Sequence, residues 1–177
     1  GDPKKRLRKR GKRSGLLVRL RRRAHRAPLP SILLANVQSL DNKVDEIRAR
    51  VAFQRDIRDE RNIQELKSFC SPDLEFLTIK CRPHYLPREF SSIIITAVYI
   101  PPQADTSMAL NELYLTLCKL ETIYPEAAFI VAGDFNKANL KTRLPKFYQH
   151  IDCATRGGKT LDHCYSNFRD AYKALPR

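Results

Sequence analysis

The stretch Ala127-Ala-Phe-Ile-Val-Ala-Gly-Asp-Phe-Asn136 decides the fold of this chain. Its unbroken apolar run, which stops at Gly133, predicts a strand that is buried on both faces. Asp134 and Asn136 follow, and alternation places them on the same side of any extended continuation. A carboxylate that can accept a proton or hold a metal then lies beside an amide that can donate to an anionic oxygen. The sequence therefore predicts, at the end of a core strand, a pair of side chains suited to phosphate-ester hydrolysis.

Further strand and helix patterns surround this strand. We expect strands at residues 31–37, 74–81, 91–100 and 161–165, and helices at residues 42–61 and 108–124. This alternation predicts a mixed α/β domain with sheets inside and helices outside. Three apolar strands end on a polar side chain, and strand ends are where α/β sheets place ligands. Each of the three has an ordinary explanation alone, but together they indicate a site: Asn36, Tyr99 and Asp134.

The chain divides into a basic tail (residues 1–27) and a predicted domain (residues 28–177). The tail holds 13 of the 33 Lys and Arg residues and a single acidic residue, so it carries +12 of the total net charge of +14. Such a block repels itself and buries no apolar area, so we expect it to be disordered on its own. Nucleic acid is the expected partner, and a nuclear-import signal or a merely solvated tail is the open alternative. The residues expected to contact nucleic acid are Arg6, Arg8, Lys9, Arg10, Lys12, Arg13, Arg21, Arg22 and Arg23.

Cysteine usage and hydropathy narrow the class of protein. The five cysteines form an odd set without a Cys-x-x-Cys pair, which favours reduced thiols over a disulfide framework or a structural zinc site. No stretch approaches the roughly 20 apolar residues that span a bilayer, and the charged start does not resemble a signal peptide. We therefore expect a nuclear or cytoplasmic location without a membrane partner. The initial Gly suggests a fragment or a processed piece.

Three motifs together resemble the endonuclease/exonuclease/phosphatase superfamily. They are Gly133-Asp-Phe-Asn136, Ala97-Val-Tyr-Ile-Pro-Pro102 and Ala35-Asn-Val-Gln-Ser-Leu40. Residues 70–83, 144–150 and 160–165 are most similar to the endonuclease domain of LINE-type non-LTR retrotransposon polyproteins. The resemblance implies an α/β fold, a four-layered β-sandwich of two facing sheets with flanking helices. It also implies cleavage of DNA phosphodiester bonds with a divalent metal, usually Mg²⁺.

The resemblance further implies a role for each site residue. Asn36 lies beside the metal, and the hydroxyl of Tyr99 contacts the scissile phosphate. Asp134 activates or positions the attacking water, and the amide of Asn136 holds a phosphate oxygen. Asp162 orients the catalytic histidine. Together these roles amount to positioning and to electrostatic stabilisation of charge on the phosphate oxygens.

Two departures from the family pattern predict an incomplete, impaired domain of marginal stability. The strand with the metal-ligating Glu and its glycine-rich hairpin have no counterpart, and Glu60 and Glu65 are expected at the exposed end of a helix. The terminal Ser-Asp-His is also missing, and alternation turns His163 away from Asp162. The remaining oxygen ligands would hold Mg²⁺ weakly. Loss of a general acid or base costs about 10²- to 10⁴-fold in rate, and unpaired sheet edges invite aggregation.

Four functions are compatible with these features. The first is an impaired, metal-dependent DNA endonuclease domain of retrotransposon origin. The second is a catalytically dead relic that binds nucleic acid through the basic tail. A phosphatase of the same superfamily that acts on a small substrate fits the tail less well, and a relic open reading frame without selected function is the fourth. Residues 155–160, a basic glycine loop, either contact a backbone phosphate or form an ordinary turn.

Overall fold

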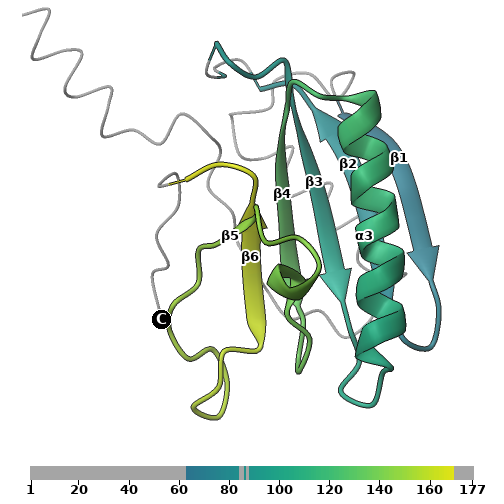
Figure 1. Ribbon diagram of the computed structural model, residues 1–177, viewed down its shortest axis with the longest axis vertical. Helices are drawn as coiled ribbons and strands as arrows, with labels where there is room; N and C mark the ends of the chain where they lie inside the picture. Colours follow the sequence, from purple (N-terminus) through teal and green to yellow (C-terminus); the bar gives the residue numbers. More distant parts are fainter. Residues whose placement is uncertain (1–62, 84–85, 87, 170–177) are drawn as a thin grey trace, which may run out of the picture.

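The computed structural model describes residues 63–83, 86 and 88–169, and within them a single mixed sheet carries one long helix (Figure 1). The strand order is β1-β2-β3-β4-β6-β5. The α/β class is confirmed, with the layers of an incomplete sandwich. The predictions for the tail, for Asn36 and for residues 31–61 lie outside the described residues. The elements are β1 (Ile63–Cys70), β2 (Glu75–Cys81), β3 (Ser92–Tyr99), α3 (Thr106–Ile123), β4 (Ala127–Asp134), the 3₁₀ helix η2 (Leu140–Thr142), β5 (Tyr148–Gln149) and β6 (Asp162–Ser166).

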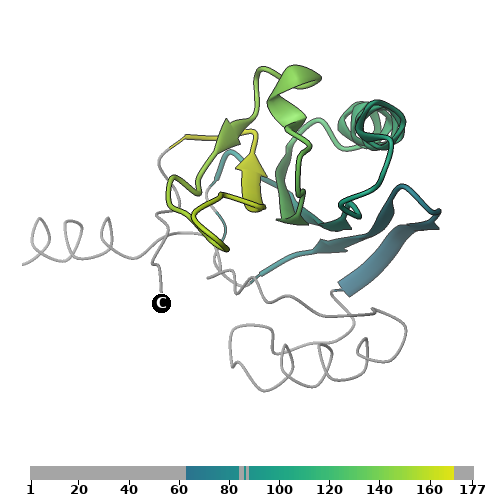
Figure 2. The ribbon, with the colours of Figure 1, turned by 90° about the horizontal axis from the view of Figure 1, so that it is seen from below.

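The unit β3–α3–β4 positions the candidate site. The two strands are parallel neighbours, and α3 crosses one face of the sheet between them, as Figure 2 shows. Asp105 begins the helix, because its carboxylate accepts hydrogen bonds from the backbone N–H groups of Ser107 and Met108. No helix in the described part of the chain combines the length and apolarity that a membrane crossing requires. The crossover leaves the ends of β3 and β4 side by side at one edge of the sheet.

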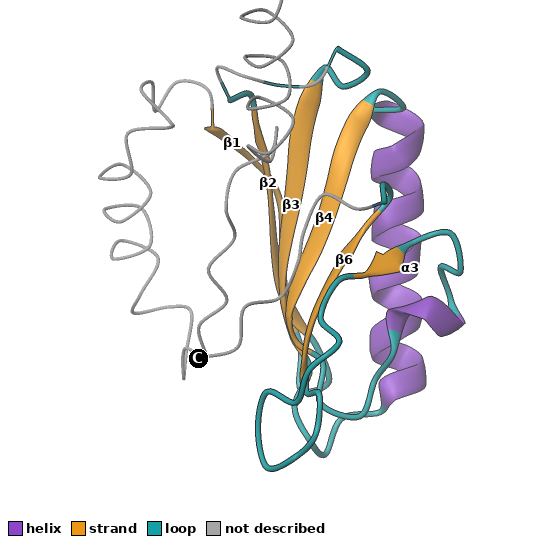
Figure 3. Cartoon of the chain, turned by 90° about the vertical axis from the view of Figure 1, so that its left-hand side faces the viewer, coloured by secondary structure: helices purple, strands orange, loops and turns teal. Residues whose placement is uncertain are grey.

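The sheet has an apolar cluster on each face. One cluster packs against α3, and η2 lies on the same side (Figure 3). The other cluster occupies the opposite face and is also buried. Strand β4 contributes to both, so its predicted burial on both faces is confirmed. The α3 cluster includes Ile94, Leu113, Leu117, Phe129 and Val131, and the opposite cluster includes Cys81, Ile93, Ala128, Ile130, Ala132 and Cys164.

Strand β1 corrects one expectation. The sequence places Glu65 at the frayed end of a helix, but Glu65 lies exposed on β1, which pairs antiparallel with β2. The apolar side chains Ile63, Leu66 and Phe69 recur at every third position, and this spacing hides the strand. A β-bulge between Glu65 and Lys67 shifts the register and breaks the two-residue alternation. The two-residue strand β5 was not predicted either, because so short a segment has no periodicity.

The five cysteines are unpaired in the structure. Two of them are buried, and loss of hydration raises the pKa of the Cys81 and Cys164 thiols to about 11. These two side chains therefore remain protonated near neutral pH and pack as small apolar groups on the face opposite α3.

Candidate functional site

Three predicted site residues lie in register across neighbouring strands. Tyr99 of β3 is the partner of Asp134 of β4, and Asp134 is the partner of Asp162 of β6. Partners in a sheet project from the same face. Asp134 alternates with Ala132 and Ile130, so this is the face opposite α3. The structure thus brings a phenol and two carboxylates together in one row, called here the carboxylate row.

Gly133 allows the close approach of β3 and β4 beside this row. Its φ is 153°, and an added Cβ would lie 1.8 Å from the carbonyl oxygen of Val98. Only glycine fits without displacing the neighbouring backbone. The chain stays paired just beyond the strand, where the N–H of Ile100 donates to the carbonyl of Asp134 over 2.9 Å. The site edge is therefore held by backbone hydrogen bonds on both sides of Asp134.

Asn136 reaches the site by a turn. The sequence predicts an extended continuation after Asp134, but Asn136 has a φ of 49°, a left-handed conformation that asparagine tolerates. Its amide donates to the carbonyl of Ile100 over 2.7 Å, and its backbone N–H donates to Asp134 Oδ1 over 3.2 Å. Alternation is therefore the wrong reason for placing Asn136 beside Asp134, although the two residues are in contact.

Arg156 is the residue at this site that sequence reasoning missed. Its Nη2 donates to Asp134 Oδ2, and its Nε lies 3.6 Å from Asp162 Oδ2. The hydrogen bond to Asp134 raises the pKa of the guanidinium, and the attraction of both carboxylates and of Tyr99 adds to the shift against the opposing effect of partial burial. With both carboxylates ionised, the three charges leave a net charge of −1 in the row. The sequence feature that could have indicated Arg156 is its position beside the pair Gly157-Gly158, six residues before Asp162.

A tight hairpin carries Arg156 to the row. The backbones of Arg156 and Lys159 exchange two hydrogen bonds, of 3.1 and 2.9 Å, around Gly157 and Gly158. These glycines have φ values of 55° and 73°, as a two-residue hairpin turn with the twist of its strands requires. At the base of the hairpin, Thr155 Oγ1 accepts hydrogen bonds from the backbone N–H groups of Leu161, over 3.0 Å, and Asp162, over 3.1 Å. The predicted glycine loop is thus a regular turn with its arginine directed at the carboxylates.

His163 belongs to the other face of the sheet, as alternation predicts. Its Nε2 lies 3.1 Å from the carbonyl oxygen of Thr160, and its Nδ1 lies 2.7 Å from the hydroxyl of Tyr165. Burial lowers the pKa of the imidazole, which favours the neutral form. A carbonyl only accepts, so the contact with Thr160 places the proton of the neutral imidazole on Nε2. His163 therefore has a structural position, turned away from the carboxylate row.

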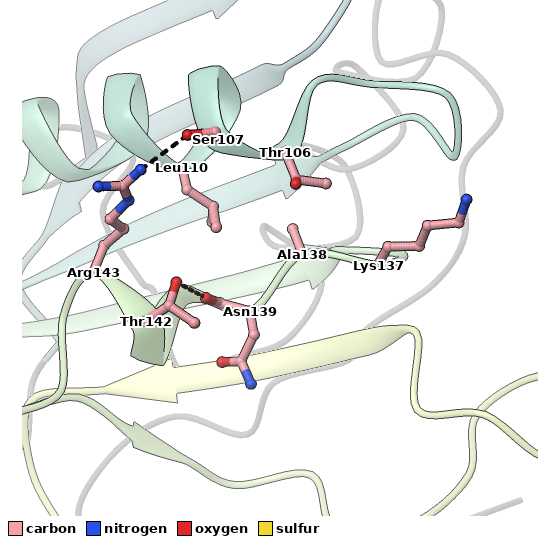
Figure 4. Close-up of a pocket in the computed structure, with 8 residues that line it drawn as sticks. All are labelled: Thr106, Ser107, Leu110, Lys137, Ala138, Asn139, Thr142 and Arg143. Atoms are coloured by element: carbon pink, nitrogen blue, oxygen red, sulfur yellow. Dashed lines mark hydrogen bonds between the residues drawn. The ribbon is translucent and has the colours of Figure 1, made fainter.

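A cavity of about 370 Å³ lies at the same edge of the sheet, between the first turn of α3 and residues 137–143 (Figure 4). Arg143 reaches α3, and its Nη2 donates to Ser107 Oγ over 3.0 Å. None of the residues in the carboxylate row lines this cavity, so the two features are separate. The lining residues are Thr106, Ser107, Leu110, Lys137, Ala138, Asn139, Thr142 and Arg143.

The magnesium ion that the resemblance implies does not fit the described residues by themselves. Mg²⁺ requires near-octahedral coordination by several oxygen atoms. Among residues 63–83, 86 and 88–169, no group of three or more acidic, histidine or cysteine side chains is placed to hold a metal. The two carboxylates of the row are paired with Arg156 instead. Asn36, the predicted metal residue, lies outside the described residues, as do the nine basic residues of the tail.

Comparison with known proteins finds similarity to solved structures. The chain is similar to the crystal structure of humanized D. rerio TDP2 with 14 mutations, at 16% identity and a TM-score of 0.41. The match covers 66% of this chain and 53% of that structure, so the chain spans about half its length. No family model and no curated protein sequence matches.

Proposed function

We propose that this chain carries the core of a phosphodiester-cleaving site, from a DNA endonuclease domain of the LINE retrotransposon type, and that its activity is impaired. One observation supports this most strongly: Tyr99, Asp134 and Asp162 are register partners on one face at the end of three adjacent strands. A phenol beside two carboxylates at a strand edge suits a reaction in which a phosphate is held and a water is directed at it.

The roles follow from the chemistry of each group. Asp134, largely buried and held by the backbone N–H of Asn136, orients the attacking water and accepts its proton. The phenol of Tyr99 donates to a phosphate oxygen. Asn136 donates one side-chain amide N–H to the carbonyl of Ile100, and this hydrogen bond fixes the amide. The second N–H is left to donate to a phosphate oxygen. The family resemblance implies that Mg²⁺ takes part, but the described residues give no coordination from which to derive its step.

Nicking of supercoiled plasmid in the presence of Mg²⁺ tests the proposal. We expect slow nicking by the intact chain and a loss of about tenfold or more for Asp134→Ala, because a general base contributes about 10²- to 10⁴-fold. Asp152→Ala, which removes an exposed carboxylate outside the row, is the matched control and should nick normally. Circular dichroism verifies that each variant is folded. Nicking that Asp134→Ala leaves unchanged contradicts the role given to Asp134.

A second candidate function is nucleic-acid binding without cleavage, which the net charge of +12 in residues 1–27 favours. Each phosphate that the tail neutralises releases counterions, so the logarithm of the affinity should fall linearly with the logarithm of salt concentration. Fluorescence anisotropy with a labelled duplex measures this slope. We expect the slope to collapse when residues 1–27 are deleted and to persist in Asp134→Ala. Salt-insensitive binding contradicts nucleic-acid binding by the tail. Plasmid nicking that is lost in Asp134→Ala supports the endonuclease instead.

A further inference from the structure

The mismatch between the carboxylate row and a metal ion has a cause within the chain. Asp134 and Asp162 are register partners, and two ionised carboxylates so placed repel each other. Arg156 relieves that repulsion, since its Nη2 donates to one carboxylate while its Nε faces the other. The planar guanidinium presents several donors in a fixed fork, which suits it to bridging two acceptors where an ammonium group cannot.

We propose that Arg156 is a built-in counter-ion that keeps divalent cations away from Asp134 and Asp162 while the turn at residues 155–160 is folded against them. The proposal rests on the proposed function in one respect, that a cation is expected at this row. It makes Arg156 a positioning residue that regulates the site. A divalent cation reaches the two carboxylates only when the guanidinium leaves them.

The hairpin is built so that Arg156 can leave. Arg156 keeps 39% of its side-chain surface exposed, although it pairs with the largely buried Asp134. Apart from the residues that flank each glycine, no atom lies within 4 Å of the point where a Cβ would stand on Gly157 or Gly158, so the tip of the turn is not packed. The base is anchored separately, through Thr155 Oγ1 and the first residues of β6. The tip of the hairpin, with Arg156, can therefore move away from the carboxylates without disturbing β6, the strand that carries Asp162.

Binding of Mn²⁺ alone to the intact chain, measured by electron paramagnetic resonance of the free ion, tests the proposal without nucleic acid. We expect Arg156→Gln to bind Mn²⁺ about tenfold or more tightly than the parent chain, because apparent affinity scales with the fraction of molecules whose carboxylates are free. Lys159→Gln removes a charge from the same turn but from outside the ion pair, and should change affinity by less than about threefold. Adding Asp134→Asn to Arg156→Gln should abolish the gain.

Equal Mn²⁺ affinities for Arg156→Gln and Lys159→Gln overturn the proposal, as does a gain that survives Asp134→Asn. Arg156→Lys keeps the charge and the stem for folding and should give an intermediate affinity. Hydrogen exchange of residues 155–160 adds a measurement on the unmutated chain: Mn²⁺ should accelerate it, and binding through Asp134 without acceleration refutes displacement. These readouts do not depend on nicking, so a chain that binds Mn²⁺ as expected but cuts nothing rejects the proposed function alone.

Discussion

Single residues set the geometry of the carboxylate row, and each does so through one physical property. Gly133 acts by what it lacks, because any Cβ would meet the carbonyl of Val98. Asn136 acts by tolerating a positive φ, which turns the chain so that its backbone N–H meets Asp134. Arg156 acts by charge, and it reaches the row only because two glycines let the turn close. The pattern of apolar and polar residues along the sequence reveals neither the missing Cβ, nor the positive φ, nor the place of the charge.

At this scale we predict that His163 makes stability depend on pH. Burial lowers the pKa of its imidazole below the ordinary value of 6.5. Between the two pKa values the unfolded chain binds more protons than the folded chain, so the free energy of unfolding falls as the pH falls below about 6.5. The stability associated with the neutral form of His163 is fully present above that pH. Urea unfolding at a series of pH values from 8 to 5 measures the slope.

The matched variant for this prediction is His163→Gln, which keeps a polar side chain but has no proton to gain. Its free energy of unfolding should be lower at neutral pH, because the contacts to Tyr165 and Thr160 are altered. Its slope between pH 6.5 and 5 should be shallower than that of the parent chain. Parallel curves for the two proteins assign the pH dependence to other groups.

The elements differ in how far their sequence reveals them. Helix 108–124 and the strands at 74–81, 91–100 and 161–165 were predicted within two residues, because each has a complete apolar period and a turn at its ends. β1 was missed because a bulge interrupts its alternation. For the site, the strand ends indicated Tyr99 and Asp134, and the family resemblance indicated Asp162. Arg156 depends instead on how a hairpin folds back over β6. A contact between a hairpin and a neighbouring strand depends on the topology of the chain, and the periodicity of apolar residues carries no information about it.

We predict that α3 depends on its N-cap, Asp105. The carboxylate accepts from two otherwise unpaired N–H groups of the first turn, and the backbone N–H of Asp105 donates to Asp73 Oδ1 over 2.8 Å. Asp105→Ala should lower the free energy of unfolding by about 1 kcal/mol, and Asp105→Asn by less, because asparagine also caps helices. Urea unfolding followed by circular dichroism measures both. An equal loss for the two variants assigns the effect to charge instead of capping.

At the scale of the whole molecule, the centre of the sheet is buried on both faces. Ile94 packs in the α3 cluster and Ile130 in the opposite cluster, on neighbouring strands, and both have no exposed surface. The carboxylate row lies at the end of this second cluster, so its position depends on a face that α3 does not cover. The stability of the site is thus tied to the packing of the face opposite α3.

The two isoleucines therefore make a matched test of the second face. Ile→Val removes one methyl group and costs about 0.5–1.5 kcal/mol in a packed core. We expect Ile94→Val and Ile130→Val to lower the free energy of unfolding equally, within a few tenths of a kcal/mol, in urea titrations of the intact chain. Ile123→Val, at a 63% exposed position on α3, should be nearly neutral. If Ile130→Val behaves like Ile123→Val, the face opposite α3 is loosely packed, and the carboxylate row lacks a rigid support.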